Sequence, residues 1–186
     1  MTKIITPNAM LSYEHLFEPA SPEGSGDEPK YSACLVFSEE TDLSDMKKAV
    51  VDAGKAKWGD KFAEMKKSGE IRIPFRSDRL EEKGYPSGSI YINARSKQPP
   101  GIVSKYAGED GRPKRITDTS EVYSGCRVRA TLSAFAYERA GNRGISFGLN
   151  NVQKLGDGER LDGRLRAEDD FEALENNASE IDDILS

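Results

Sequence analysis

The stretch that most constrains the fold is residues 121–155, EVYSGCRVRATLSAFAYERAGNRGISFGLNNVQKL. Two segments rich in β-branched and aromatic residues flank the turn sequence AGNRG at residues 140–144. Glycine and asparagine tolerate the positive φ that a tight turn needs, so this pattern predicts a long β-hairpin. We expect the rest of the chain to be organised around this hairpin.

The two faces of the first hairpin arm differ in chemistry. Because side chains alternate along a strand, one face holds the small apolar residues Cys126, Val128, Ala130, Leu132, Ala134 and Ala136. The other face holds Arg127, Arg129, Thr131, Ser133, Phe135, Tyr137 and Arg139. Cations that meet phosphates, beside rings on which bases stack, are typical of a platform for single-stranded nucleic acid. The alternative is a solvated strand in which a slip of one residue buries the two rings.

Charge is segregated along the sequence. The net charge is −5, but residues 167–186 carry eight acidic side chains and no lysine or arginine. Residues 71–166, which include the hairpin, hold 18 basic and 11 acidic side chains. A basic body with a separate acidic tail can still bind nucleic acid, so the overall acidity does not exclude that partner.

The remaining patterns predict a mainly β protein with a helical insertion. Residues 31–37 are typical of a buried strand, which we expect to pair with a hairpin arm. Residues 42–67 show apolar side chains at spacings of three or four, which predicts a helix, or two shorter helices because of glycines at 54 and 59. We expect a domain over residues 1–156, a linker over 157–166 and a mobile acidic tail over 167–186.

Two further segments share the chemistry of the hairpin. Residues 89–96 alternate so that Tyr91 and Arg95 are expected to face outward, and Lys97 follows. Residues 104–118 predict a flexible loop with basic residues around a tyrosine, or else an ordinary solvated loop. The predicted DNA-binding residues are therefore Tyr91, Arg95, Lys97, Lys105, Tyr106, Arg112, Lys114, Arg115, Arg127, Arg129, Phe135, Tyr137 and Arg139.

Motifs that would indicate an enzyme are missing from the sequence. It has no glycine-rich phosphate loop, no His/Cys metal cluster and no Gly-x-Ser-x-Gly turn, so we expect no catalytic residue, cofactor or metal. The cysteines, Cys34 and Cys126, are expected to be buried in a reducing compartment. No apolar run approaches the roughly 20 residues that cross a bilayer. We therefore expect a cytoplasmic protein without a membrane partner.

Three segments carry a resemblance to a known family: KYSACLVF at residues 30–37, VYSGCRVRA at 122–130 and GISFGLNNVQK at 144–154. In these segments the chain resembles bacteriophage single-stranded DNA-binding proteins, which have an OB fold and an acidic C-terminal tail. The resemblance implies a five-stranded Greek-key barrel with a helical insertion. It also implies binding of single strands without strong sequence preference, in DNA replication, recombination or repair.

The same resemblance implies a role for the tail. In related phage proteins the tail competes with DNA and recruits replication or recombination proteins. Here that role would belong to Asp169, Asp170, Phe171, Glu172, Asp182, Asp183, Ile184 and Leu185. The ending DDILS departs from the family version, which ends in phenylalanine.

Single-stranded DNA is the expected partner, with duplex DNA bound more weakly and self-association left open. Two other functions compete with this hypothesis. One is a strand-annealing recombination protein, which also binds single strands. The other is a virion or adaptor β domain that binds proteins rather than DNA.

Overall fold

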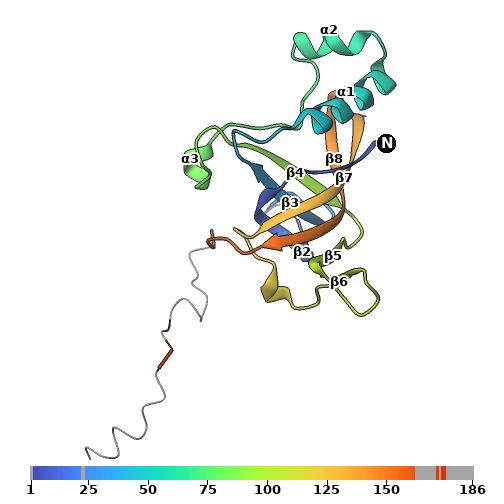
Figure 1. Cartoon of the computed structure of the whole chain (residues 1–186). Coiled ribbons are helices and arrows are strands. Elements are labelled where there is room, and N and C mark those ends of the chain that lie inside the picture. Colours follow the sequence, from blue (N-terminus) through green and yellow to red (C-terminus); the bar gives the residue numbers. More distant parts are fainter. Residues whose placement is uncertain (1, 22–23, 162–170, 172, 175–186) are drawn as a thin grey trace, which may run out of the picture.

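Five strands form a closed ring at the centre of the fold (Figure 1). The computed structural model describes residues 2–21, 24–161, 171, 173 and 174. The ring strands, in order, are β2 (Ala9–Ala20), β3 (Lys30–Phe37), β4 (Ile90–Ser96), β8 (Asn142–Gly156) and β7 (Arg127–Arg139). β7 closes the ring because it pairs with both β8 and β2, and β4 runs parallel to β8. This is the five-stranded barrel that the resemblance implied.

Three shorter strands extend the barrel. β1 (Thr2–Ile5) pairs with the part of β7 that does not pair with β2. Just after β1, the Thr6 hydroxyl accepts a hydrogen bond from the Ala130 amide at 3.0 Å. β5 (Gly101–Ala107) pairs with the end of β8, and β6 (Pro113–Arg115) pairs with β5. The prediction of a flexible loop over residues 104–118 is therefore wrong for much of its length, because backbone pairing orders it as a hairpin.

The predicted alternation along β7 is present in the structure. Val128, Leu132 and Ala134 are fully buried in the barrel, whereas Phe135 and Tyr137 are half-buried on the outer side. The β7–β8 pairing has two irregularities, and in each of them β8 has one residue more than β7. The alternation of side chains along β7 is therefore not interrupted. The alternative in which a slip buries both rings is thereby excluded. The prediction that residues 31–37 pair with a hairpin arm is wrong, since β3 pairs with β2 and β4.

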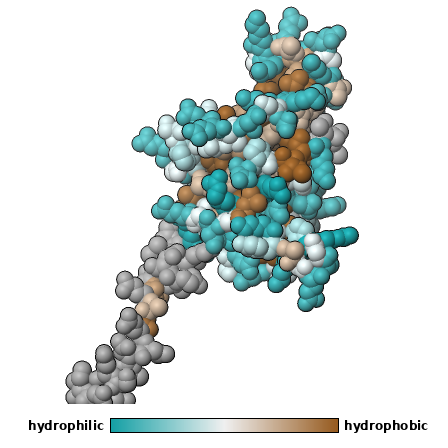
Figure 2. All heavy atoms as spheres, viewed as in Figure 1, coloured by the Kyte–Doolittle hydropathy of each residue, from teal (hydrophilic) through white to brown (hydrophobic). Residues whose placement is uncertain are grey.

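The predicted helical insertion consists of two helices. α1 (Ser44–Trp58) packs against β1, β7 and β8, and α2 (Lys61–Lys67) follows after a break at Gly59, whose φ is 60° (Figure 1). Trp58 stacks on Phe62 with ring centroids 6.3 Å apart. Figure 2 shows a largely hydrophilic surface, with apolar side chains visible mainly where these helices meet the barrel. None of the helices in the described ranges is long and apolar enough to span a membrane.

Gly54 determines how closely the two helices approach each other. It is buried in α1, and a Cβ at this position would overlap the ring of Phe62. Replacing glycine by alanine inside a helix normally stabilises it by about 1 kcal/mol. We expect Gly54→Ala to destabilise the protein instead, by about 1–3 kcal/mol, because overpacking outweighs helix propensity. Urea unfolding measures the change, and a stability equal to or above wild type would contradict it.

A second, smaller core lies on the outside of the barrel. Residues 76–89, which include α3 (Leu80–Lys83), cover part of the outer face of β3 and β4. Cys34, Tyr85 and Tyr91 are buried there, and the Tyr91 hydroxyl donates to the Asp78 carbonyl at 3.1 Å. Burial raises the pKa of Tyr85, whose hydroxyl donates to Ser12 Oγ at 2.8 Å.

This second core corrects one predicted site residue. Tyr91 does lie on the outer face of its strand, as the alternation predicts, but it is only 1% exposed because residues 76–89 cover it. It therefore presents no ring surface to DNA. Cys34 and Cys126 are both buried free thiols, and burial raises the pKa of each.

Candidate nucleic-acid interface

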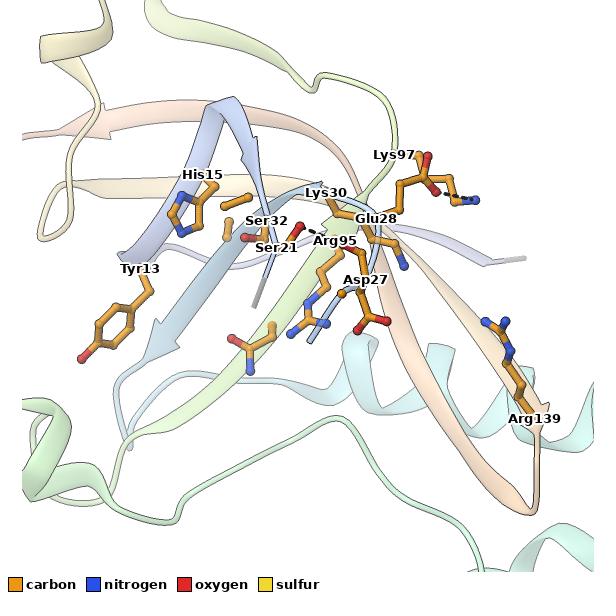
Figure 3. A pocket seen from close by; sticks show the side chains of 14 residues that line it. Tyr13, His15, Ser21, Asp27, Glu28, Lys30, Ser32, Arg95, Lys97 and Arg139 are labelled. Carbon is orange, nitrogen blue, oxygen red and sulfur yellow. Dashed lines mark hydrogen bonds and ion pairs between the residues drawn. The ribbon is translucent and has the colours of Figure 1, made fainter. Parts of the chain in front are cut away.

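An open groove crosses the outer face of β2, β3 and β4, next to the part that residues 76–89 cover. Its volume is about 690 Å³. Four cationic side chains line it: Lys30 at the start of β3, Arg95 in β4, Lys97 just after β4, and Arg139 at the end of β7. Figure 3 shows Tyr13 at one end of the groove and Arg139 at the other, with the Arg95 guanidinium between them.

Strand pairing explains why residues that are distant in sequence meet here. Arg95 is in register with Ser32 of β3 on one side and with Gly148 of β8 on the other. Gly148 in turn pairs with Ser133, and Ser32 pairs with His15. Paired residues place their side chains on the same side of a sheet, so His15, Ser32, Arg95 and Ser133 lie in one polar row, in which β8 contributes only the backbone of Gly148.

The cations in the groove are largely unneutralised. Lys97 is 3.4 Å from Glu28, but both side chains are mostly exposed, so the ion pair is weak. In the described part of the chain, no ion pair involves Lys30, Arg95 or Arg139. Asp27 and Glu28 are acidic residues of the groove lining, and Figure 3 shows them close to Arg95 and Lys97. A polyanion in this groove would meet these cations and would also face the carboxylates of Asp27 and Glu28.

A second hollow of about 390 Å³ adjoins the groove and brings in the two aromatic residues of the hairpin. Phe135 and Tyr137 line it together with Lys30, Arg95 and Lys97, which also line the first groove. Cations and aromatic rings thus share one continuous surface, which is the combination that single-strand binding needs.

Glycines of β8 support both rings from behind. A Cβ at Gly148 would lie 3.8 Å from the Phe135 ring, and one at Gly144 would lie 2.6 Å from the Tyr137 hydroxyl. Each ring therefore rests against a backbone without a side chain. This packing holds the rings in place and leaves them half-exposed.

Five of the predicted residues form a second, separate basic surface on the β5–β6 hairpin. Lys105, Tyr106, Arg112, Lys114 and Arg115 are all exposed, and the Lys105 amino group lies 5.2 Å from the centroid of the Tyr106 ring. None of the five lines the groove. Figure 1 shows β5 and β6 at the end of the barrel opposite α1.

The two arginines at the start of β7 belong with the β5–β6 surface. Arg129 pairs with Gln153 of β8, Gln153 pairs with Val103 of β5, and Val103 pairs with Arg115 of β6. The Arg129 Nε donates to Gln153 Oε1 at 2.7 Å. Arg127 is exposed two residues before Arg129 on the same strand.

The predicted residues therefore separate into three groups. Arg95, Lys97, Phe135, Tyr137 and Arg139 meet at the groove, the β5–β6 residues with Arg127 and Arg129 form the second surface, and Tyr91 is buried. Among the predicted tail residues, Phe171 is exposed. The others, Asp169, Asp170, Glu172, Asp182, Asp183, Ile184 and Leu185, lie outside the described residues.

Sequence reasoning missed most of the groove lining, including the acidic residues Asp27 and Glu28 and three side chains that can contact DNA, Tyr13, His15 and Lys30. Lys30 begins a strand that reads as buried, and Tyr13 and His15 lie in a strand whose alternation is interrupted. Only the position of Lys30 just after an acidic loop gave a signal in the sequence. Within the ranges that the structure describes, no group of three or more His, Cys, Asp or Glu side chains could hold a metal ion.

A family model and a relative of known sequence both match most of the chain. The family model described as Enterobacter phage Enc34 ssDNA-binding protein matches residues 2–185. Putative protein p50 of Acyrthosiphon pisum secondary endosymbiont phage 1 is 31% identical over 171 residues, which cover 87% of each protein.

Solved structures share the fold. The Enc34 single-stranded DNA-binding protein in complex with ssDNA superposes with a TM-score of 0.61 at 22% identity, covering 85% of this chain and 88% of that one. The single-stranded DNA-binding protein gp2.5 of bacteriophage T7 gives a TM-score of 0.62 at 12% identity, covering 90% and 99%.

Proposed function

The chain belongs to the Enterobacter phage Enc34 ssDNA-binding protein family, and from this premise we propose that it binds single-stranded DNA along the groove of β2, β3 and β4. The observation that carries the proposal is the meeting of unneutralised cations and half-exposed rings on one face. The phosphates lie along Lys30, Arg95, Lys97 and Arg139. The bases stack on Phe135 and Tyr137.

In this binding mode the affinity depends little on the base sequence of the DNA. Every base has a flat face that can stack on an aromatic ring, and phosphates are the same at every nucleotide. We therefore expect similar affinities for oligonucleotides of different composition. Duplex DNA hides its bases in the stack, so it can use the cations of the groove but not the rings, and it binds more weakly.

The β5–β6 surface is a second contact for the same strand. Its exposed Lys105, Arg112, Lys114 and Arg115, together with Tyr106, have the same chemistry as the groove. A strand long enough to leave the groove along β8 would reach it. The longer strand then neutralises more charge, so affinity rises with oligonucleotide length.

The acidic tail competes with DNA for the groove and contacts replication or recombination proteins. Eight acidic side chains without a cation, in residues 167–186, are complementary in charge to the groove. We expect removal of residues 167–186 to tighten binding to oligo-dT roughly fivefold to tenfold at low salt, because an intramolecular competitor is lost. Fluorescence anisotropy measures the difference.

Two controls isolate the charge of the tail. Replacing its eight acidic residues by Asn and Gln at constant length should tighten binding as much as the truncation does. The advantage of both variants should shrink at high salt, where charges are screened. A truncated chain that binds oligo-dT no better than the full chain at low salt would contradict the competition.

The protein acts without chemistry of its own, in the cytoplasm of a phage-infected cell, during DNA replication, recombination or repair. The experiment that tests the proposed function is a titration of the full chain with fluorescent oligo-dT at two salt concentrations. Saturable binding that weakens with salt supports the proposal, and no binding at low salt overturns it. Mixing complementary strands in the same assay shows whether the protein also anneals them.

A further inference from the structure

The backbone of β2 contains an irregularity at the edge of the groove. Ser12 pairs with Cys34 and His15 pairs with Ser32, so β2 has one more residue than β3 between these two pairs. This is a β-bulge, and its extra residue lies at Tyr13 or Glu14. Bulges re-aim side chains, and they occur often beside functional sites.

Tyr13 has an unfavourable backbone conformation in this bulge. Its φ is 41°, in the left-handed region that a bulky residue rarely adopts. Its side chain is 60% exposed, so no burial of the ring compensates for the strain. A glycine or asparagine would be favoured at such a position if only the fold mattered.

Two contacts nevertheless fix Tyr13, one at the preceding residue and one at its ring. The preceding residue, Ser12, is buried and accepts the hydrogen bond from Tyr85. The Lys83 amino group lies 5.3 Å from the centroid of the Tyr13 ring and 5.4 Å from that of Tyr91. The second core thus fixes the backbone before the bulge and places a cation over the ring.

The ring stands at one end of the groove. Tyr13 and His15 line it together with Arg95 and Arg139, and Figure 3 shows the Tyr13 side chain at the end opposite Arg139. A strand that runs from Arg139 past Arg95 would therefore meet the Tyr13 ring next. Lys83, which lies over that ring, would meet the adjoining phosphate.

We propose that Tyr13 is a base-stacking residue. The bulge in β2 directs its ring outward, and the ring extends the DNA path to the far end of the groove. The inference rests on the proposed function and adds a third stacking ring to those of the hairpin. It explains why a strained tyrosine is exposed at this position. It also gives the second core a role, since Tyr85 and Lys83 act as positioning residues for Tyr13.

The test compares substitutions at Tyr13 by affinity for oligo-dT and by melting temperature. Tyr13→Gly should weaken binding about tenfold, because one stacked base is lost. Its melting temperature should stay within about 2 °C of wild type, since relief of the strain offsets the lost ring contacts and the flexibility of glycine. Tyr13→Phe keeps the ring and should bind within about twofold of wild type.

A direct readout comes from Tyr13→Trp in a Trp58→Phe background. Stacking of a thymine on the introduced indole should quench its fluorescence as oligo-dT is added, and the wild-type Trp58 signal should stay constant. If wild type binds oligo-dT but Tyr13→Gly binds equally well, or if the indole is not quenched, the inference is wrong. If wild type itself fails to bind, the proposed function fails instead.

Discussion

For the chain without residues 167–186 and an oligo-dT short enough to stay within the groove, the affinity should fall about 600-fold for a tenfold rise in salt concentration, if the four groove cations each neutralise one phosphate. The logarithm of the binding constant falls with the logarithm of the salt concentration, by about 0.7 for each phosphate contact on a single strand. Lys30, Arg95, Lys97 and Arg139 line the groove, and the proposed binding mode assigns one such contact to each. Anisotropy titrations over a range of NaCl concentrations give the slope.

Single substitutions test whether the salt dependence of the binding constant comes from the cations of the groove. Arg95→Gln should reduce it by about 0.7, because one phosphate contact is lost. The matched control is Lys48→Gln on α1, where the lysine is highly exposed and pairs only weakly with Asp52 at 3.6 Å. We expect the control to keep the wild-type slope. Equal slopes for the two variants would contradict the assignment of the phosphate path to the groove.

Replacing both hairpin rings, by Phe135→Ala together with Tyr137→Ala, should weaken oligo-dT binding about 100-fold, since each stacked base contributes roughly 1–3 kcal/mol. The salt slope should stay close to wild type, because no cation is removed. This combination separates stacking from charge. Anisotropy titrations at several salt concentrations provide both values.

A core substitution in the same strand controls for lost stability. Leu132 is fully buried in β7, so Leu132→Ala should destabilise the protein by about 2–5 kcal/mol without changing the affinity of the folded state. Tyr137→Ala should lose much less stability, since its ring is only half-buried against Gly144. If Tyr137→Ala instead unfolds as readily as Leu132→Ala and still binds DNA normally, the ring is a core residue and not a stacking platform.

The acidic loop before β3 bears on the interpretation of these measurements. Asp27 and Glu28 line the groove, and Glu28 pairs with Lys97. DNA that occupies the groove must displace or accommodate these carboxylates, so the measured affinity includes their repulsion of phosphate. The Lys97 contact should therefore contribute less than that of Arg95, which has no ion pair within the described residues.

The sequence predicted the hairpin and both of its faces correctly, because alternation is a local property of a strand. Val128 and Leu132 on the inner side and Phe135 and Tyr137 on the outer side are where the period of two put them. The helical insertion was also found from its own periodicity. Periodicity alone does not locate the break between the two helices, because Gly54 and Gly59 are both compatible with it, and the structure places the break at Gly59.

What the sequence by itself determined is thus the long hairpin, the helical insertion, the inner face of β7 and the family, which follow from local periodicity and specific short segments. The β5–β6 hairpin and α3 had no such periodicity. Only the tertiary structure decided which cations and rings share a surface, because strand pairing joins residues such as Lys30, Arg95 and Arg139 across long separations. It also buried Tyr91, since a distant loop covers an outer face that alternation alone leaves exposed. The bulge at Tyr13 had no local signal, because its strain is held by contacts from Tyr85 and Lys83, more than sixty residues away in the chain.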